Sequence, residues 1–405
     1  MTGYPGPSNF SGKLKKMNAS YERIDKKSLV GGVAILFITH FVVDSHGTFF
    51  APLIPLLREK FQFSLATAGM LISVQSMTSA ISQPLTALLI DRWPRLPWLP
   101  VGIVGCSIAF TSIGWMPTFW GVALAIPVGG IFFGLCHPDM ASRSGSLSPE
   151  NSSLAVSLFV TGGRLGFAFG PIICIAIVTR LGLEWLWIYV FVALGTMLLI
   201  VLCLPRPEAR KIKAADSEGL LAALTRVRGP IGFLFAVAVS RAIIMGNLGG
   251  FLPTIYVEGG LGLWAGGIAN TVLYVSGAAG VLIGGFYGDR IGKRTVILTG
   301  LLIGLAGMTG FLILPLTYGF FLLVLIGVGN FIPMGVSVAY AQSLMPEHRG
   351  FASSIFLGGG WFISAFTSAP IAAAAEYFGL LNVFWVLPLS LAIGIILALK
   401  LPREA

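Results

Sequence analysis

Two arginines that fall inside long apolar stretches are the residues whose chemistry is least expected in this chain. Arg164 lies about twelve residues into the stretch 152–178, and Arg241 lies about eleven residues into 230–256. At a helical rise of 1.5 Å per residue, both side chains come out near the middle of about 30 Å of hydrocarbon. Two guanidinium groups facing one cavity would form a fork for a carboxylate, phosphate or phosphonate. The alternative is that one of them pairs with Asp44 and is purely structural.

A histidine and an aspartate in the first apolar stretch have the chemistry to carry protons. His40 and Asp44 are four residues apart, so they share one face of a helix. An imidazole beside a carboxylate can relay protons between pH 5 and 8. His46 lies about 200° from Asp44 around the helix and is less suited to that role. The alternative is a structural pair that holds the first apolar stretch to the fifth.

Further polar side chains at depth are candidate substrate contacts. His137 and Asp139 flank Pro138 near one end of the stretch 119–141, and Arg143 follows Asp139 by one helical turn. We expect Asp139 and Arg143 to form a structural salt bridge and His137 to face the cavity. In the second half of the chain the candidates are uncharged: Asn330, midway along 317–342, Tyr274 and Trp361.

The composition requires a membrane around these residues. The chain of 405 residues is 56% hydrophobic and only 10% charged, with a mean hydropathy of +0.88. Soluble domains carry about 25% charged residues. The four cysteines, at unrelated spacings within apolar stretches, are interpreted as packing residues. There is no nucleotide-binding loop and no motif with metal-ligand spacing, so the sequence predicts no enzyme, no cofactor and no metal site.

Twelve stretches are long enough to cross the hydrocarbon, which needs roughly 20 apolar residues each. The predicted fold is an all-α membrane protein of twelve transmembrane helices in two pseudo-symmetric six-helix bundles. The expected spans are 29–50, 67–90, 97–117, 119–141, 152–178, 184–204, 230–256, 264–288, 294–315, 317–342, 350–376 and 381–401. The corresponding domains are an N-terminal tail (1–28), a first bundle (29–204), a linker (205–229), a second bundle (230–401) and a C-terminal tail (402–405).

The distribution of Lys and Arg predicts the orientation. With both termini inside, the cytoplasmic face holds twenty-one of them, and the outer face holds only Arg58, Lys60 and Arg180. This follows the positive-inside rule and predicts a multi-pass protein of a bacterial inner (plasma) membrane. The net charge of +10 therefore reflects topology, and a nucleic-acid partner is not expected.

A repeated charged segment links the two halves to a known family. The segment GFYGDRIGKR at 285–294 has a partial copy, ALLIDRWPR, at 87–95, and Asp289 follows Asp91 by 198 residues. Pro149 and Pro346 recur at an offset of 197. The segment resembles the signature of the major facilitator superfamily between spans two and three, and the match is full at 285–294. The resemblance implies two halves that rock about a central site.

In such a transporter these segments would act as a gating latch that favours one conformation. The aspartates would sit near the exposed amides of a neighbouring helix N-terminus, and the basic residues would meet carboxylates of the opposite half. The alternative is that the charges only fix topology. The residues concerned are Asp91, Arg92, Asp289, Arg290 and Arg294.

Three stretches in the first half are similar to the fosmidomycin-resistance branch of that superfamily. They are THFVVD at 39–44 with PLIPL at 52–56, GLCHPD at 134–139, and the glycine-rich run from Phe159 to Pro171. The resemblance implies efflux of a small phosphonate-like or otherwise polar drug in exchange for protons. Arg164 is a departure, because it stands where an amide is expected after the glycine pair.

We interpret the sequence as a secondary transporter that moves a small organic anion by proton-coupled alternating access. Arg164 and Arg241 would hold the anion, together with His40, His137, Asn330, Tyr274 and Trp361, and Asp44 with His40 would carry protons. The expected partners are the anion, protons and the lipid bilayer, and the expected state is a monomer; symport and antiport both remain open. Two alternatives are a proton-driven drug exporter, with Arg164 a structural partner of Asp44, and a non-transporting membrane sensor.

Overall fold

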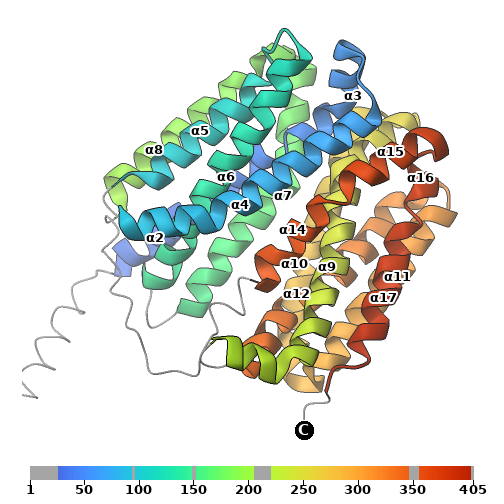
Figure 1. Ribbon diagram of the computed structural model, residues 1–405. Coiled ribbons are helices and arrows are strands. Elements are labelled where there is room, and N and C mark those ends of the chain that lie inside the picture. The colour runs from blue at the N-terminus through green and yellow to red at the C-terminus, as the bar shows by residue number, and fades with distance from the viewer. Residues whose placement is uncertain (1–25, 94–95, 148–151, 205–219, 346–354, 403–405) are drawn as a thin grey trace, which may run out of the picture.

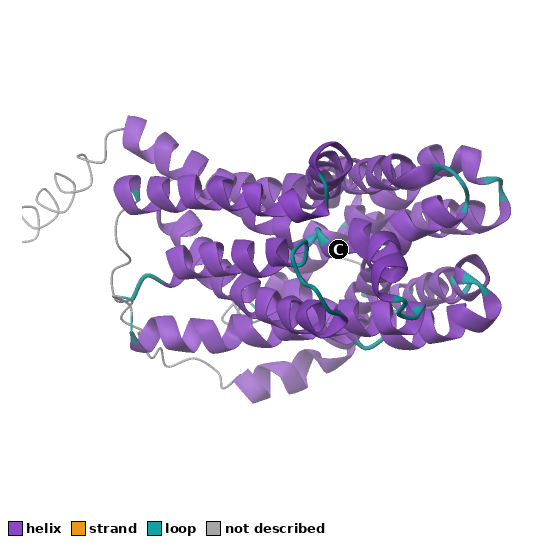
Figure 2. Ribbon diagram, turned by 90° about the horizontal axis from the view of Figure 1, so that it is seen from above, coloured by secondary structure: helices purple, strands orange, loops and turns teal. Residues whose placement is uncertain are grey.

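All regular structure in the described residues is helical. The computed structural model describes residues 26–93, 96–147, 152–204, 220–345 and 355–402, and Figure 2 shows helices joined by short loops. The first half contains α2 (Lys26–Gly47), α3 (Phe50–Phe61), α4 (Leu65–Arg92), α5 (Trp98–Ser112), α6 (Phe119–Leu147), α7 (Ser152–Leu181), the 3-10 helix η1 (Leu183–Tyr189) and α8 (Val190–Cys203). The second half contains α9 (Leu220–Glu258), α10 (Gly262–Ile291), α11 (Lys293–Ile313), the 3-10 helix η2 (Leu316–Tyr318), α12 (Gly319–Leu344), the π-helix η3 (Ile355–Gly359), α14 (Gly360–Ala365), α15 (Ser368–Phe378), α16 (Leu380–Val383) and α17 (Val386–Ala398).

These helices combine into twelve rods, six in each half of the described chain. Five rods are built from consecutive pieces: α2 with α3, η1 with α8, η2 with α12, η3 with α14 and α15, and α16 with α17. Figure 1 shows the two halves as separate bundles, coloured blue to green and yellow to red. The predicted fold class, two six-helix bundles without strands, is confirmed for the described residues.

The rods are suited to lipid. Nine helical segments of the described residues are long and apolar enough to cross a membrane, and the most apolar, Leu183–Cys203, has a mean hydropathy of 2.6. Large apolar side chains point outward, with Trp120 exposed to 78% and Leu202 to 71%. Such a surface would aggregate in water. The chain is therefore an integral, multi-pass membrane protein.

Glycine seams let helices within each half approach closely, as the spacing predicts. Gly162, Gly166 and Gly170 of α7 all face backbone atoms of α2; a Cβ on Gly170 would lie 2.5 Å from the Ser45 carbonyl oxygen. Lipid gives helices no hydrophobic reason to associate, so close backbone contact supplies the attraction instead. The matching seam in the second half is formed by α10 against α12, at Gly280, Gly284 and Gly288.

The two bundles form a V (Figure 1). They meet at the end that carries α3 and the turn between α15 and α16, which we call the closed end, and they diverge toward the end that carries the start of α2 and the end of α8, the open end. Polar contacts that join the halves include Arg58 Nη1 to Glu258 Oε1 at 3.2 Å, the Ala66 amide to Glu376 Oε1 at 2.8 Å, the Ala369 amide to Ser73 Oγ at 3.1 Å, and Thr271 Oγ1 to the Ala168 carbonyl oxygen at 2.6 Å. The molecule is thus seen with its two halves in contact at one end and apart at the other.

Some predicted boundaries differ from the structure. The first rod continues through α3 to Phe61, so Arg58 and Lys60 are helical rather than in a loop. Helix α9 begins at Leu220, inside the expected linker, and bends at Val227. The described part of rod eleven starts with a π-helical turn, Ile355–Gly359. The expected tail residues 1–25 and 403–405, linker residues 205–219, and Pro94, Arg95, Pro149 and Pro346 lie outside the described residues.

Candidate substrate and coupling site

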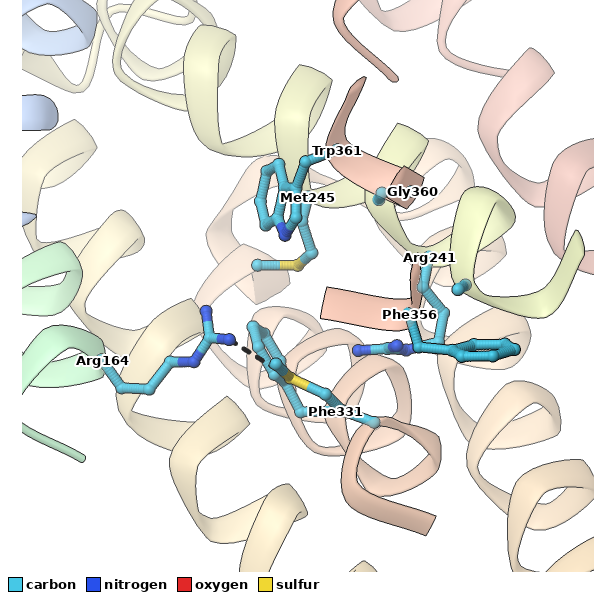
Figure 3. Close-up of a pocket in the computed structure, with 10 residues that line it drawn as sticks. Arg164, Arg241, Met245, Phe331, Phe356, Gly360 and Trp361 are labelled. Atoms are coloured by element: carbon cyan, nitrogen blue, oxygen red, sulfur yellow. Dashed lines mark hydrogen bonds between the residues drawn. The ribbon is translucent and has the colours of Figure 1, made fainter. Parts of the chain in front are cut away.

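A pocket between the halves contains both of the arginines predicted at mid-depth. Its walls come from α7 of the first half and from α9, α12 and rod eleven of the second (Figure 3). The lining residues are Arg164, Ala238, Arg241, Ala242, Met245, Phe331, Met334, Phe356, Gly360 and Trp361. Three of the predicted substrate contacts, Arg164, Arg241 and Trp361, therefore lie together although they come from different rods.

The two guanidinium groups flank one aromatic ring. The Cζ atom of Arg164 lies 5.0 Å from the centroid of Phe331, and that of Arg241 lies 5.9 Å from it. Arg164 Nη2 donates to the sulfur of Met334 at 3.2 Å, and Arg241 Nε donates to the carbonyl oxygen of Asn330. Within the described part of the chain neither guanidinium forms an ion pair with a carboxylate. A thioether is a weak acceptor, so Arg164 keeps most of its capacity to bind an anion.

Two other predicted substrate contacts lie behind the pocket wall. Asn330 is fully buried and donates through Nδ2 to the Arg241 carbonyl oxygen at 3.2 Å. The ring of Tyr274 packs 6.4 Å from that of Phe331 and 5.4 Å from that of Phe167. Neither lines the pocket. In this conformation they hold Arg241 and Phe331 in place rather than facing a ligand.

The predicted proton pair gains a third member. His40 Nε2 lies 3.3 Å from Asp44 Oδ2, and His137 Nε2 lies 3.2 Å from Asp44 Oδ1. His137 comes from α6. It was expected to face a ligand, but in this structure it contacts Asp44 instead. All three side chains are largely shielded, at 19% exposure or less. The alternative pairing of Arg164 with Asp44 is not seen among the described ion pairs.

Hydrogen bonding sets the protonation of this cluster. Nδ1 of His40 faces the Phe159 carbonyl oxygen at 2.7 Å, and Nδ1 of His137 faces that of Phe133 at 2.8 Å. A carbonyl oxygen only accepts, so both Nδ1 atoms carry hydrogen. A hydrogen bond between either Nε2 atom and an oxygen of Asp44 then requires one more proton, carried by one of the two atoms. With both protons present the cluster has a net charge of +1, and without them it has −1.

The cluster adjoins the pocket through one peptide of α7. A Cβ on Gly163 would lie 2.5 Å from Asp44 Oδ2 and 2.5 Å from His40 Nε2, so glycine is required for this packing. The next residue, Arg164, extends to Phe331 and Met334 in the other half. The charge of Asp44 also acts electrostatically on Arg164. The cluster and the pocket are therefore physically coupled.

The ligand-type atoms of the cluster all lie within 4.8 Å of one another, which is also near enough to share a cation. Sequence spacing does not reveal this grouping, because His137 is 93 residues from Asp44. His46, which the helical wheel excluded, instead bonds the Val42 carbonyl oxygen at 2.6 Å and Ser107 Oγ at 2.7 Å.

The predicted salt bridge near the open end is present. Arg143 donates from Nε to Asp139 Oδ1 at 2.8 Å and from Nη2 to Oδ2 at 3.0 Å, a two-pronged pair within α6. It lies outside the pocket lining. This pair has the structural role that the four-residue spacing indicated.

The basic residues of the predicted latch contact only their own halves in the contacts that are described. Arg92 lies 5.3 Å from the Trp93 ring, Arg290 lies 3.5 Å from the Phe286 ring, and Arg294 donates to the Leu399 carbonyl oxygen at 2.6 Å. The side chains of Asp91 and Asp289 are not among those described. These segments belong to the open end, where the halves have diverged, so the latch stays a prediction.

Sequence reasoning missed the apolar side of the pocket. Phe331, Phe356, Met245 and Met334 were not among the predicted contacts. The chain has 29 phenylalanines and 11 methionines, mostly in apolar stretches. Composition and helical spacing give no signal that separates these four from residues that face lipid.

Two six-helix bundles around a charged pocket define a secondary transporter. The chain belongs to the Major Facilitator Superfamily, whose family model matches residues 36–369. This family consists of transporters, so the protein is a transporter and not an enzyme.

Relatives and solved structures agree with this assignment. The chain is 26% identical over 365 residues to the fosmidomycin resistance protein of Escherichia coli (strain K12), covering 86% of this chain and 87% of that protein. It is also 26% identical to the MFS-type transporter YfnC of Bacillus subtilis (strain 168), over 91% and 92% of the two chains.

Among solved structures, a D-xylose-proton symporter has a TM-score of 0.75 at 15% identity, and an inward-facing bacterial homologue of the human lysosomal transporter Spinster has 0.74 at 15%. Each comparison covers 92% of this chain and 97% of the other. At such low identity these two structures support the fold alone.

Proposed function

We propose that the protein carries a small organic anion bound between Arg164 and Arg241, and that protons on the His40–Asp44–His137 cluster drive the transport. One observation carries the proposal: two guanidinium groups from opposite halves flank the Phe331 ring in one pocket. Burying a cation without a counter-charge is costly. A bound anion would remove that cost.

An anion in this pocket would touch both halves. Arg164 belongs to α7 in the first half and Arg241 to α9 in the second. A ligand that bridges the two arginines can contact both of them only in conformations that bring the two bundles close together at the pocket. Such a difference in interaction between conformations is what lets a ligand shift a conformational equilibrium.

The charge of the cluster sets the sign of the coupling. A doubly protonated cluster, at +1, repels the neighbouring guanidinium of Arg164 and leaves it for the anion. A deprotonated cluster, at −1, competes with the anion for the same guanidinium. Protons and anion therefore favour each other's binding, which is the requirement for symport.

The orientation follows from charge. Among the described residues, Arg58, Lys60 and Arg180 fall on the side of the closed end, whereas ten Lys and Arg residues fall on the side of the open end: Lys26, Lys27, Arg92, Arg143, Arg226, Arg228, Arg290, Lys293, Arg294 and Lys400. The positive-inside rule then gives a cytoplasmic open end with both termini inside, in a bacterial plasma membrane. In this orientation the conformation is inward-facing, and the transporter works as a monomer.

A second function, drug export by proton exchange, is favoured by the similarity to the fosmidomycin resistance protein over most of both chains. Exchange would require the opposite sign of coupling, because protons and drug would then have to compete. The affinity for a carboxylate such as benzoate, which stays ionised between pH 5.5 and 7.5, separates the two functions. Symport predicts tighter binding at the lower pH, and exchange predicts weaker binding.

The test of anion transport is flux into proteoliposomes of acetate, benzoate, methylphosphonate or phenylphosphonate, with and without a pH gradient. Hydrogen bonds to charged groups contribute about 1.5–3 kcal/mol. Arg164→Gln and Arg241→Gln should therefore each lower the flux of a transported anion by about 10- to 150-fold. Undiminished transport by both variants would sink the proposal.

The test of proton coupling uses the carboxylate of the cluster. Asp44→Asn should abolish uptake driven by a pH gradient while anion exchange at equal pH continues. Glu184→Gln, which alters an exposed carboxylate away from the pocket, is the matched control and should behave as the unmodified protein. Gradient-driven uptake that persists in Asp44→Asn contradicts the proposal. So does uptake that requires added Zn²⁺ and stops with a chelator, since a cation would then replace the protons.

A further inference from the structure

We infer that the anion is an aromatic acid, an inference that rests on the proposed function and narrows its substrate class. The pocket combines two guanidinium groups with an unusually aromatic wall. Phe331, Phe356 and Trp361 supply three rings, and Met245 and Met334 supply two thioethers. The two guanidinium groups would bind the acid group of the ligand, and the aromatic rings would contact the rest of the ligand.

The polar groups in the lining are of one kind. The guanidinium groups of Arg164 and Arg241 and the indole N–H of Trp361 are all donors, and among the described residues no carboxylate, amide or hydroxyl side chain lines the pocket. An ammonium ligand would find no counter-charge here. A sugar-like ligand, which donates as well as accepts, would leave its hydroxyl hydrogens without partners. The lining suits a ligand whose only polar part is an acceptor.

The acid group has a defined place to bind. Arg164 Nη2 now donates to the thioether of Met334. A carboxylate or phosphonate oxygen would replace this weak bond by a charge-assisted one. Arg241 Nε is committed to the Asn330 carbonyl oxygen, which fixes that side chain and leaves its two terminal nitrogens for the ligand.

The body of the ligand would lie among the rings. Figure 3 shows the side chains of Met245 and Trp361 on one side of the space and Phe331 on the other, with Arg164 and Arg241 toward opposite ends. Aromatic pairs prefer offset or edge-to-face contacts, and thioethers contact ring edges favourably. An aromatic ring gains both contacts, whereas a saturated ring of the same size gains burial alone.

The experiment compares three phosphonates that share one head group. Binding of phenylphosphonate, cyclohexylphosphonate and methylphosphonate to the full chain in lipid nanodiscs is measured by calorimetry at a single pH. Cyclohexylphosphonate should bind more tightly than methylphosphonate because it buries more apolar surface. Phenylphosphonate should bind a further 2- to 13-fold or so more tightly, which is the usual size of an aromatic pair contact.

A pair of tryptophan variants locates the effect. Trp361→Leu should reduce the ratio of phenyl to cyclohexyl affinity toward one. Trp385→Leu makes the same change at a half-exposed position outside the pocket and should leave that ratio unaltered. Equal affinities for phenyl- and cyclohexylphosphonate, or a ratio that Trp361→Leu does not change, would overturn the inference.

The possible results distinguish a failure of this inference from a failure of the proposed anion transport. If methylphosphonate binds as tightly as phenylphosphonate, the anion site stands and the aromatic class is wrong. If no phosphonate binds, or if benzylamine binds as tightly as phenylphosphonate, both the aromatic class and the anion site are wrong.

Discussion

A methyl group added at Gly69 should push the molecule out of the conformation seen here. Gly69 lies on α4 and faces α15 of the other half. A Cβ at this position would lie 2.6 Å from the Ser368 carbonyl oxygen and 3.2 Å from its carbon, and would collide with the Cβ of Ala372. Ordinary carbon contacts are about 3.5–4.0 Å. Backbone atoms cannot rotate away, so the helices must separate by about 1 Å.

The size of the effect follows from this overlap. Overpacking of a close contact costs about 1–3 kcal/mol. The contact joins the two halves at the closed end, so the cost falls on this conformation and is absent once the halves part there. Gly69→Ala should therefore lower the population of the closed-end conformation relative to the alternative by about 5- to 160-fold.

The measurement is a distance between spin labels on either side of the closed end. Cysteines replace Lys60, at the end of α3, and Leu261, before α10, and Cys203→Ser removes the exposed native thiol. The short distance should dominate in the unmodified protein. In Gly69→Ala a longer distance should become the major one.

Two glycine variants control for other causes. Gly250→Ala also faces the opposite half, but its nearest neighbour is the flexible end of Ile72 at 3.1 Å, so the distribution should change little. Gly284→Ala collides with the Ile332 carbonyl within one bundle, so it should lower the melting temperature without lengthening the distance. An unchanged distribution in Gly69→Ala, or loss of stability like that of Gly284→Ala, would refute the reasoning.

Three further changes have defined outcomes. Gly163→Ala should displace the imidazole of the proton cluster and lower gradient-driven flux at least about tenfold, whereas Gly335→Ala, with open space around its Cβ, should not alter flux. Asp139→Asn removes the charge from the carboxylate that pairs with Arg143 in a largely buried contact and should lower the free energy of unfolding by up to about 3–5 kcal/mol, as measured by thermal unfolding. Arg58→Gln removes an exposed ion pair worth about 1 kcal/mol or less, so it should shift the label distances by less than about fivefold in population, and high salt should mask the difference.

The architecture could be predicted from the sequence because its determinants are local. Apolar length specifies the rods, and glycines at every fourth position specify where rods touch, as on α7 against α2. Helical spacing likewise predicted the Asp139–Arg143 pair and the shared face of His40 and Asp44. The first rod was misjudged at its end, because the apolar sequence runs on to Leu57 and α3 continues to Phe61 in spite of Pro52 and Pro55.

The rest of the site depends on contacts between distant segments. Asp44 and His137 are 93 residues apart, and no periodicity links them. Arg164 and Met334 are 170 residues apart and come together only because the two bundles meet. The position of a charge at mid-depth indicated that Arg164 is functional. Phe331, whose ring lies between the two arginines, is of a residue type that is common throughout membrane helices, so the sequence does not single it out.

The duplicated architecture explains why such unlike residues share one pocket. Arg164 and Trp361 are separated by 197 residues, the offset that relates the two halves, and both line the pocket. Corresponding rods of the halves therefore meet at the centre, and the positions that face each other there are free to differ. One carries a cation and the other an aromatic ring, although the second half also contributes Arg241. Under the proposed function, this asymmetry rather than the symmetric frame would select an acidic ligand with an aromatic body.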